Sequence, residues 1–215
     1  MRREFHVRFC EGPGGKFPRA TRRNIYVRSQ KSGERVMASV TSFLERKLRL
    51  RVNREKSGVA PAWERKFLGH RLLPEGRLGL APESLKRAKA RIRQITRRNR
   101  GISLEGMIHE LNSYLTGWVT YFRYAECRTH LGRLDGWIRR KLRCVRLKQR
   151  KRAKPIADFL QRLGVPEWRA WRLAGSGKGW WRMAGSPQAA EAMTLEWFRE
   201  QKLVTLTARY TQLNQ

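Results

Sequence analysis

One stretch of the sequence, residues 103–122, constrains the fold more than any other part. Within it, large apolar side chains recur at alternating intervals of four and three residues, which is the spacing of one face of an α-helix. They are Leu104, Ile108, Leu111, Leu115, Trp118 and Phe122. The stretch holds no Lys or Arg, although these two types make up 49 of the 215 residues. We therefore expect a helix over 103–122 that is the most buried element of the protein.

Two further amphipathic helices flank this stretch, over about 83–99 and 129–150. The first carries an apolar stripe of Leu85, Ala88, Ile92 and Ile95, and the second one of Leu131, Leu134, Ile138, Leu142 and Val145. Gly101 is a stop signal for the first helix. The pattern predicts a three-helix bundle over residues 82–154.

The segment before the bundle, residues 24–81, has a mixed pattern. Residues 24–29 are rich in β-formers, 33–48 have helical periodicity, and 50–53 read as a second strand. Pro74 and Gly76 lie between two apolar runs and predict a hairpin. After the bundle, residues 155–215 read as short helices separated by Gly and Pro. The expected fold is mostly α, with a small α+β region, the three-helix bundle and a short helical C-terminal extension.

The charge of the chain limits its partners. The formal net charge is +32 and the pI is about 11.6, so self-repulsion destabilises the compact chain unless a polyanion neutralises it. Nucleic acid is the expected partner, and an anionic membrane surface is the alternative. No apolar run has the length of a membrane span, and the N-terminus lacks the apolar core of a signal peptide. We expect a cytoplasmic protein with no membrane partner.

The basic residues concentrate on the two flanking helices. Between Ser84 and Lys154 there are 21 Lys and Arg residues against four acids, whereas an ordinary solvated face alternates charges because like charges four residues apart repel. An ordinary solvated face is the alternative interpretation. The residues expected to bind RNA are Lys86, Lys89, Arg93, Arg97, Arg98 and Arg100 on the first helix, and Arg139, Arg140, Arg143, Arg146, Lys148, Arg150, Lys151 and Arg152 on the last.

The strongest part of this prediction is a stripe on the last helix. Arg139, Arg143, Arg146 and Arg150 follow one another at intervals of four, three and four residues, so they share a face. This face lies roughly 100° around the helix from Ile138, Leu142 and Val145. The helix is therefore expected to dock by one side and to offer guanidinium groups to phosphates on the other.

The tryptophans of the C-terminal extension have two interpretations. Trp168, Trp171, Trp180 and Trp181 either fill the core of a small appended region, which we favour, or stack on unpaired bases. Trp180 is the best candidate for stacking, because it follows the glycine-rich sequence "GSGKG". That sequence lacks the first glycine and the final Ser or Thr of a nucleotide-binding P-loop.

The sequence predicts no bound metal or cofactor. Cys127 and His130 form a C-x-x-H pair, but no second pair lies at the spacing of a zinc site. The three cysteines, which include Cys10 and Cys144, are too widely spaced to indicate a disulfide framework. The four histidines have no partners at catalytic spacing.

From Asn24 onward the sequence resembles the C-terminal half of group II intron reverse transcriptases/maturases. The resemblance rests on "YVRSQKSGERVMASVTSFLERKLRLRVNREKS", on the stretch from "WERKFLGHRLLPEGRLGLAPESLKRAKARIRQ" to "YLTGWVTYFRYAE", and on "HLGRLDGWIRRKLRCVRLKQRKRAKPI". It implies that residues 24–81 are the end of a polymerase palm, with a primer-grip-like hairpin at Phe67-Leu68-Gly69. Residues 82–154 would be the thumb, or maturase-specific domain X, and 155–215 a helical extension.

The same resemblance implies that the polymerase centre is missing. In the family, a Tyr-Ala-Asp-Asp turn before the equivalent of "NIYVRS" holds Mg²⁺, whereas this sequence has a segment with one acid, Glu11. The chain has only two aspartates, Asp135 and Asp158, both in its helical part. We therefore expect no enzymatic activity and no Mg²⁺ site. Residues 1–23, which the resemblance does not cover, are expected to be disordered or scrambled.

Three hypotheses for the function follow. The first is a maturase-like fragment that binds structured group II intron RNA and assists splicing. The second is half of a split RNA-directed DNA polymerase, completed by a separate fingers–palm chain. The third is a decayed gene product without a selected role. The strand at Tyr26–Arg28 would be the docking edge for that separate chain or for a homodimer.

Overall fold

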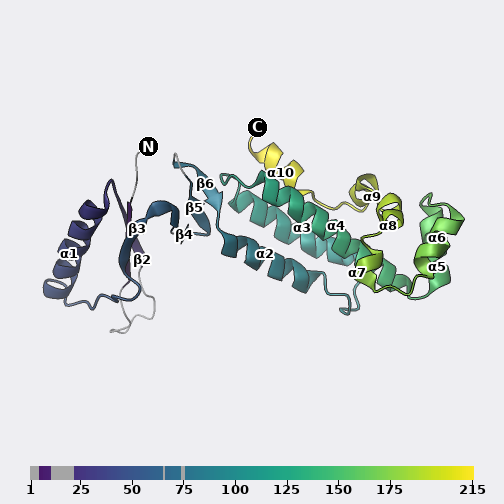
Figure 1. Ribbon diagram of the computed structural model, residues 1–215, viewed down its shortest axis with the longest axis horizontal. Coiled ribbons are helices and arrows are strands. Elements are labelled where there is room, and N and C mark those ends of the chain that lie inside the picture. Colours follow the sequence, from purple (N-terminus) through teal and green to yellow (C-terminus); the bar gives the residue numbers. More distant parts are fainter. Residues whose placement is uncertain (1–4, 11–21, 65, 74–75) are drawn as a thin grey trace. The chain divides into compact units, whose positions relative to one another are not determined.

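The computed structural model describes residues 5–10, 22–64, 66–73 and 76–215 (Figure 1). The chain divides into two compact units, residues 1–84 and 85–215, which we call the N-terminal unit and the helical unit. The fold is mostly α with a small β part, as the sequence predicts.

A three-stranded antiparallel sheet and one helix form the first part of the N-terminal unit. Strand β1 (Phe5–Cys10) lies between β2 (Arg22–Val27) and β3 (Gly58–Pro61). Helix α1 (Gln30–Arg46) begins after Ser29, whose hydroxyl accepts a hydrogen bond from the backbone N–H of Ser32 at 3.2 Å. Its apolar face packs on a small core that consists of Val52 with the partly buried Ile25, Val27, Met37, Val40, Leu44 and Val59.

Strand β1 corrects the prediction of disorder for part of residues 1–23. Phe5–Cys10 is a strand paired on both sides, with Val7 opposite Ile25 of β2 and Val59 of β3. Phe5, Val7 and Phe9 alternate with polar residues, which is the pattern of a strand that the neighbouring Gly and Pro residues obscured. Residues 22 and 23 of the same segment begin β2, and residues 1–4 and 11–21 lie outside the described residues.

A second small sheet completes the N-terminal unit. It follows the short 3₁₀ helix η1 (Ala62–Glu64) and consists of β4 (Lys66–Phe67), β5 (His70–Leu72) and β6 (Leu78–Leu80), all antiparallel. The turn between β4 and β5 is Leu68-Gly69, where both residues have positive φ. The hairpin predicted from Pro74 and Gly76 is confirmed, because β5 pairs with β6. Strands β4 and β5 form a second hairpin around Leu68-Gly69. The strand expected over 50–53 is reduced to a single bridging residue, Val52, and β3 follows it instead.

The three predicted helices of the bundle are confirmed as α2 (Pro82–Ile95), α3 (Leu104–Tyr121) and α4 (Arg128–Arg150). The Ser103 hydroxyl caps α3 by accepting a hydrogen bond from Gly106 N–H at 3.0 Å. The buried residues of α3 are Leu104, Met107, Ile108, Leu111, Leu115 and Val119, which agrees with the helical periodicity of the sequence. The apolar stripe of α4 is buried as well, and so is that of α2 apart from the half-buried Leu85.

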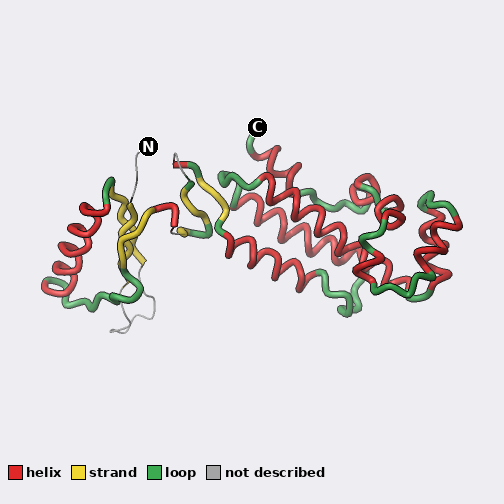
Figure 2. Tube along the Cα trace, in the orientation of Figure 1, coloured by secondary structure: helices red, strands yellow, loops and turns green. Residues whose placement is uncertain are grey.

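The segment after α4 consists of short helices joined by loops (Figure 2). These are α5 (Ala153–Arg162), α6 (Glu167–Ala174), α7 (Trp180–Met183), α8 (Pro187–Ala192), α9 (Leu195–Glu200) and α10 (Leu206–Leu213). They share one compact unit with the bundle. The expected boundary between the bundle, residues 82–154, and the extension, residues 155–215, stays a prediction.

Helix α10 is fixed to the bundle by a buried carboxylate. Asp135 of α4 accepts hydrogen bonds from the N–H groups of Leu206 and Thr207, at 2.9 and 3.0 Å, and from the Thr207 hydroxyl. These N–H groups belong to the first turn of α10 and have no partner within their own helix. Asp135 thus caps a helix that lies more than 70 residues later in the chain.

Candidate nucleic-acid interface

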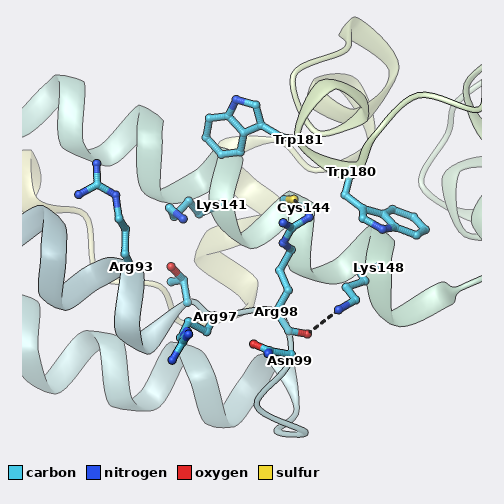
Figure 3. A pocket seen from close by; sticks show the side chains of 10 residues that line it. Arg93, Arg97, Arg98, Asn99, Lys141, Cys144, Lys148, Trp180 and Trp181 are labelled. Atoms are coloured by element: carbon cyan, nitrogen blue, oxygen red, sulfur yellow. Dashed lines mark hydrogen bonds between the residues drawn. The ribbon is translucent and has the colours of Figure 1, made fainter.

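A cationic cleft of about 710 Å³ lies within the helical unit (Figure 3). It is bounded by the C-terminal end of α2 and the residues after it, by the middle of α4, and by the start of α7. Its lining residues are Arg93, Thr96, Arg97, Arg98, Asn99, Lys141, Cys144, Lys148, Trp180 and Trp181. Five of them are cations and none is an Asp or Glu, so the cleft favours an anionic ligand.

The loop after α2 forms one wall of the cleft and is held against α4. Lys148 Nζ donates to the backbone oxygen of Arg98 at 3.3 Å, a bond drawn in Figure 3. One residue further along α4, Gln149 Nε2 donates to the oxygen of Ile102 at 3.2 Å. The buried Thr96 hydroxyl closes the end of α2 by donating to Ile92 O at 2.6 Å. These bonds fix the backbone that presents Arg97, Arg98 and Asn99.

Helix α4 supplies Lys141, Cys144 and Lys148, which share one face at helical spacing. Burial, with a smaller contribution from the nearby Arg93, lowers the pKa of Lys141. Burial also raises the pKa of Cys144, and this outweighs the opposing effect of Arg98, whose Nη1 lies 3.8 Å from the sulfur. The thiol is therefore protonated at neutral pH, and the positive charge of the cleft is not offset.

The third wall is aromatic and is held in place by Arg140. The Arg140 guanidinium donates twice to the Trp181 carbonyl, at 3.3 and 3.1 Å, and lies 4.3 Å from the centre of the indole ring. Gly185 leaves the room for this contact, because a Cβ there would come within 2.8 Å of three guanidinium atoms. Arg140, one of the predicted RNA-binding residues, thus holds the aromatic wall.

Of the predicted residues, the cleft brings together Arg93, Arg97, Arg98, Lys148 and Trp180. Lys86 and Lys89 lie earlier on α2, and Lys151 and Arg152 follow α4, outside the cleft lining. Sequence reasoning did not name Thr96, Asn99, Lys141 or Cys144 as site residues, and it preferred Trp180 to Trp181. Lys141 could have been predicted, because its spacing from Lys148 places both on one face of the helix. The position of the loop residues could not, because it depends on tertiary contacts.

Arg100 has a structural partner in this unit. Its guanidinium forms an ion pair with Glu110 of α3, at 2.7 Å, and donates to the Ile95 carbonyl at 2.7 Å. These bonds tie the end of α2 to α3. Binding of RNA by Arg100 would have to compete with both.

The arginine stripe of α4 is not the open face that the sequence predicts. Arg143 donates twice to the Met193 carbonyl, at 3.2 and 2.7 Å, and its guanidinium carbon lies 5.7 Å from the centre of the Phe198 ring. Arg146 and Arg150 lie over the Phe159 ring, at 5.4 and 4.6 Å. Burial accordingly lowers the pKa of Arg143 and of Arg150. Much of the stripe holds the C-terminal helices, and its period alone could not reveal these distant partners.

The favoured interpretation of the tryptophans as core residues is also wrong for most of them. Trp168, Trp171 and Trp181 are 64%, 42% and 40% exposed, and Trp180 is half-buried in the cleft wall. Trp197 of α9, which is not one of these four, is buried and packs edge-on against Phe159 and Phe198. The helices of the extension are too short to cover so many large rings.

Other candidate sites find no support in the described part of the chain. There, no group of three His, Cys, Asp or Glu side chains is arranged to hold a metal ion. Burial raises the pKa of Cys127 to about 11, so this thiol is a buried neutral group. None of the helices searched in the described ranges combines the length and hydropathy of a membrane span.

Most residues that line the cleft lie in a segment that matches a known protein family. Residues 85–164 match the sequence profile of the family described as "Group II intron, maturase-specific domain". This segment is therefore similar to group II intron maturase-specific domains. No curated protein matches the chain.

The matched segment covers most of α2, all of α3 and α4, and α5. It therefore contains all five cations of the cleft, whereas Trp180 and Trp181 lie beyond its end. The match indicates a maturase-like role in group II intron splicing.

Proposed function

We propose that the helical unit binds structured group II intron RNA, that the cleft and the adjoining face of α2 contact its phosphates, and that this binding assists splicing. The observation that carries the proposal is a cleft without a carboxylate whose five cations all lie in the segment that matches the maturase-specific domain. Guanidinium and ammonium groups that have no acidic partner in a cleft are suited to phosphate oxygens.

Such binding would assist folding of the intron without a catalytic side chain. Helices of RNA repel one another when they pack, and cations placed between phosphates offset this repulsion. Contact with about six to eight phosphates would make the affinity fall by orders of magnitude between low and moderate salt.

The proposal includes the absence of polymerase activity from this chain. Of its two aspartates, Asp135 is buried and uses both carboxylate oxygens to cap α10. Asp158 lies on a different helix, α5. The chain thus has no adjacent pair of aspartates, whereas the family resemblance implies such a pair as the holder of the two metal ions of nucleotide transfer.

The test is binding of the purified chain to a group II intron transcript over a range of KCl concentrations. Replacing Arg93 and Arg97 by Gln removes two exposed cleft cations, and the matched control replaces Arg128 and Arg172, two exposed cations outside the cleft lining. The cleft variant should bind at least about tenfold more weakly, with a salt slope smaller by about 1.5, since each lost phosphate contact removes roughly 0.7 to 0.9.

The control variant should stay within about twofold of the unchanged protein. An equal loss in both variants would mean that the chain binds polyanions by net charge alone. No loss in the cleft variant would exclude the cleft as the RNA contact.

A further inference from the structure

We infer that the cleft holds one unpaired nucleotide of the bound RNA, with its phosphate among the cations and its base against Trp180. This inference rests on the proposed function, because it names the part of the RNA that enters the site. Trp180 and the cations belong to one continuous cavity of the helical unit.

The size of the cleft fits a single nucleotide. Its volume is about 710 Å³, within the range of roughly 300 to 1,000 Å³ that is typical of pockets for one small ligand. An RNA duplex presents its phosphates on the outside and keeps its bases stacked, so it does not need a pocket of this kind. A bulged or looped-out nucleotide does, and sequence-specific recognition of RNA mostly targets such unpaired positions.

Trp180 offers a ring for the base. Among the described residues, no cation and no other aromatic ring stacks on Trp180, whereas one face of Trp181 is covered by Arg140. Trp180 is half-buried in the wall, so part of its surface is open to the cleft. Stacking on an aromatic side chain suits any base, because every base has a π-face.

Asn99 offers hydrogen bonds to the edge of the base. Its side-chain amide has both a donor and an acceptor, which is the combination that reads base edges. The Thr96 hydroxyl, another neutral polar group of the lining, already donates to Ile92 O. In Figure 3 Asn99 and Arg97 lie opposite the two tryptophans, on the other side of the opening.

The cations account for the phosphate. Arg93, Arg97, Arg98, Lys141 and Lys148 line the same cleft without an acid among them. Lys141 is only partly exposed and lies near Arg93, so its charge is destabilised until an anion arrives. A nucleotide meets both requirements of the cleft, a negative charge for the cations and a flat apolar group for the indole.

The experiment compares two RNA hairpins with the same stem. One carries a single bulged 2-aminopurine, whose fluorescence is quenched by stacking, and the other is fully paired. The unchanged protein should bind the bulged hairpin about tenfold more tightly than the paired one and quench its fluorescence, since stacking on one aromatic ring accounts for a factor of this order.

Three variants make the test specific. Trp180→Ala should bind both hairpins with the affinity that the unchanged protein has for the paired one, and should not quench. Trp180→Phe keeps a ring and should retain most of the preference and the quenching, which excludes simple unfolding as the cause. Trp168→Ala removes another exposed indole, outside the cleft lining, and should behave like the unchanged protein.

Failure of this inference and failure of the proposed function give different results. Equal affinity of the unchanged protein for both hairpins, with salt-dependent binding of the intron transcript, would overturn the single-nucleotide site and leave the proposed function standing. Binding of free AMP as tightly as the bulged hairpin would also overturn it, because the site would then serve a free nucleotide. Failure to bind the transcript at low salt would overturn both.

Discussion

The two units of this protein contain helices with similar amphipathic patterns but very different burial. In the helical unit, Leu111 of α3 and Leu142 of α4 are fully buried, and each helix hides a complete apolar face. In the N-terminal unit, the 17-residue helix α1 buries only Gly33, and its Phe43 is 54% exposed. An amphipathic pattern shows which face of a helix is apolar, but it does not show how much surface is available to cover that face.

The difference has a simple energetic meaning. Burying a large aliphatic side chain completely contributes about 1.5 to 3 kcal/mol relative to leaving it exposed. Helix α3 has six buried positions, whereas the core beside α1 has, among the residues whose burial the structure describes, one buried residue, Val52, surrounded by partly buried ones. The helical unit should therefore be considerably more stable than the N-terminal unit.

The largest expected effect of this difference is on hydrogen exchange. Backbone amides in α3 and α4 should exchange at least about 1,000-fold more slowly than those in α1, because opening of the poorly covered helix costs less free energy. A factor of that size corresponds to about 4 kcal/mol. Exchange of the intact chain, followed by peptide mass spectrometry, measures both regions in one sample. Equal protection of α1 and α3 would refute the comparison.

Two substitutions to alanine, one in each unit, test the difference in burial at single side chains. Leu111→Ala in α3 should lower the free energy of unfolding of the helical unit by about 2 to 5 kcal/mol, since it leaves a cavity in a closed core. Phe43→Ala in α1 removes a side chain that is more than half exposed and should change stability by about 1 kcal/mol or less. Urea unfolding of both variants gives the two values, and a larger loss for Phe43→Ala would contradict the difference in burial.

A smaller effect should follow from loss of the cap on α10. Asp135→Ala leaves the N–H groups of Leu206 and Thr207 without their acceptor and should cost about 1 to 3 kcal/mol. Asp158→Ala on α5, which removes the chain's other aspartate, is the matched control, with an expected change of about 0.5 kcal/mol. Exchange of α10 amides should accelerate in the first variant alone. If both variants respond equally, Asp135 does not act through α10.

The parts of the structure that follow from local pattern were predictable. The alternating four and three residue intervals of 103–122 located α3, and the turn signal at Pro74 and Gly76 located the hairpin before α2. Strand β1 was missed because six alternating residues lie next to a run of Gly and Pro, and because one of its two partners, β3, is distant in sequence.

The candidate site was predictable only in part, because local pattern does not show which side chains from distant parts of the sequence pack on it. Periodicity shows that Arg143 and Arg150 share a face of α4, but not that Phe198 and Phe159 return to cover them. It also shows that Arg97 is basic and exposed, but not that Lys148 holds the neighbouring backbone. Contacts between residues some 50 positions apart decide which cations remain available to a ligand.

The position of Trp180 and Trp181, beyond residue 164, has a practical consequence for any attempt to isolate the maturase-specific domain. A piece excised at that boundary would keep every cation of the cleft and lose its entire aromatic wall. It would also expose the guanidinium groups of Arg140 and Arg143, which in the whole unit donate hydrogen bonds to the carbonyls of Trp181 and Met193. Such a piece would bind polyanions more tightly and with less discrimination among them. Affinities measured on it would therefore overestimate the contribution of charge to binding by the whole protein.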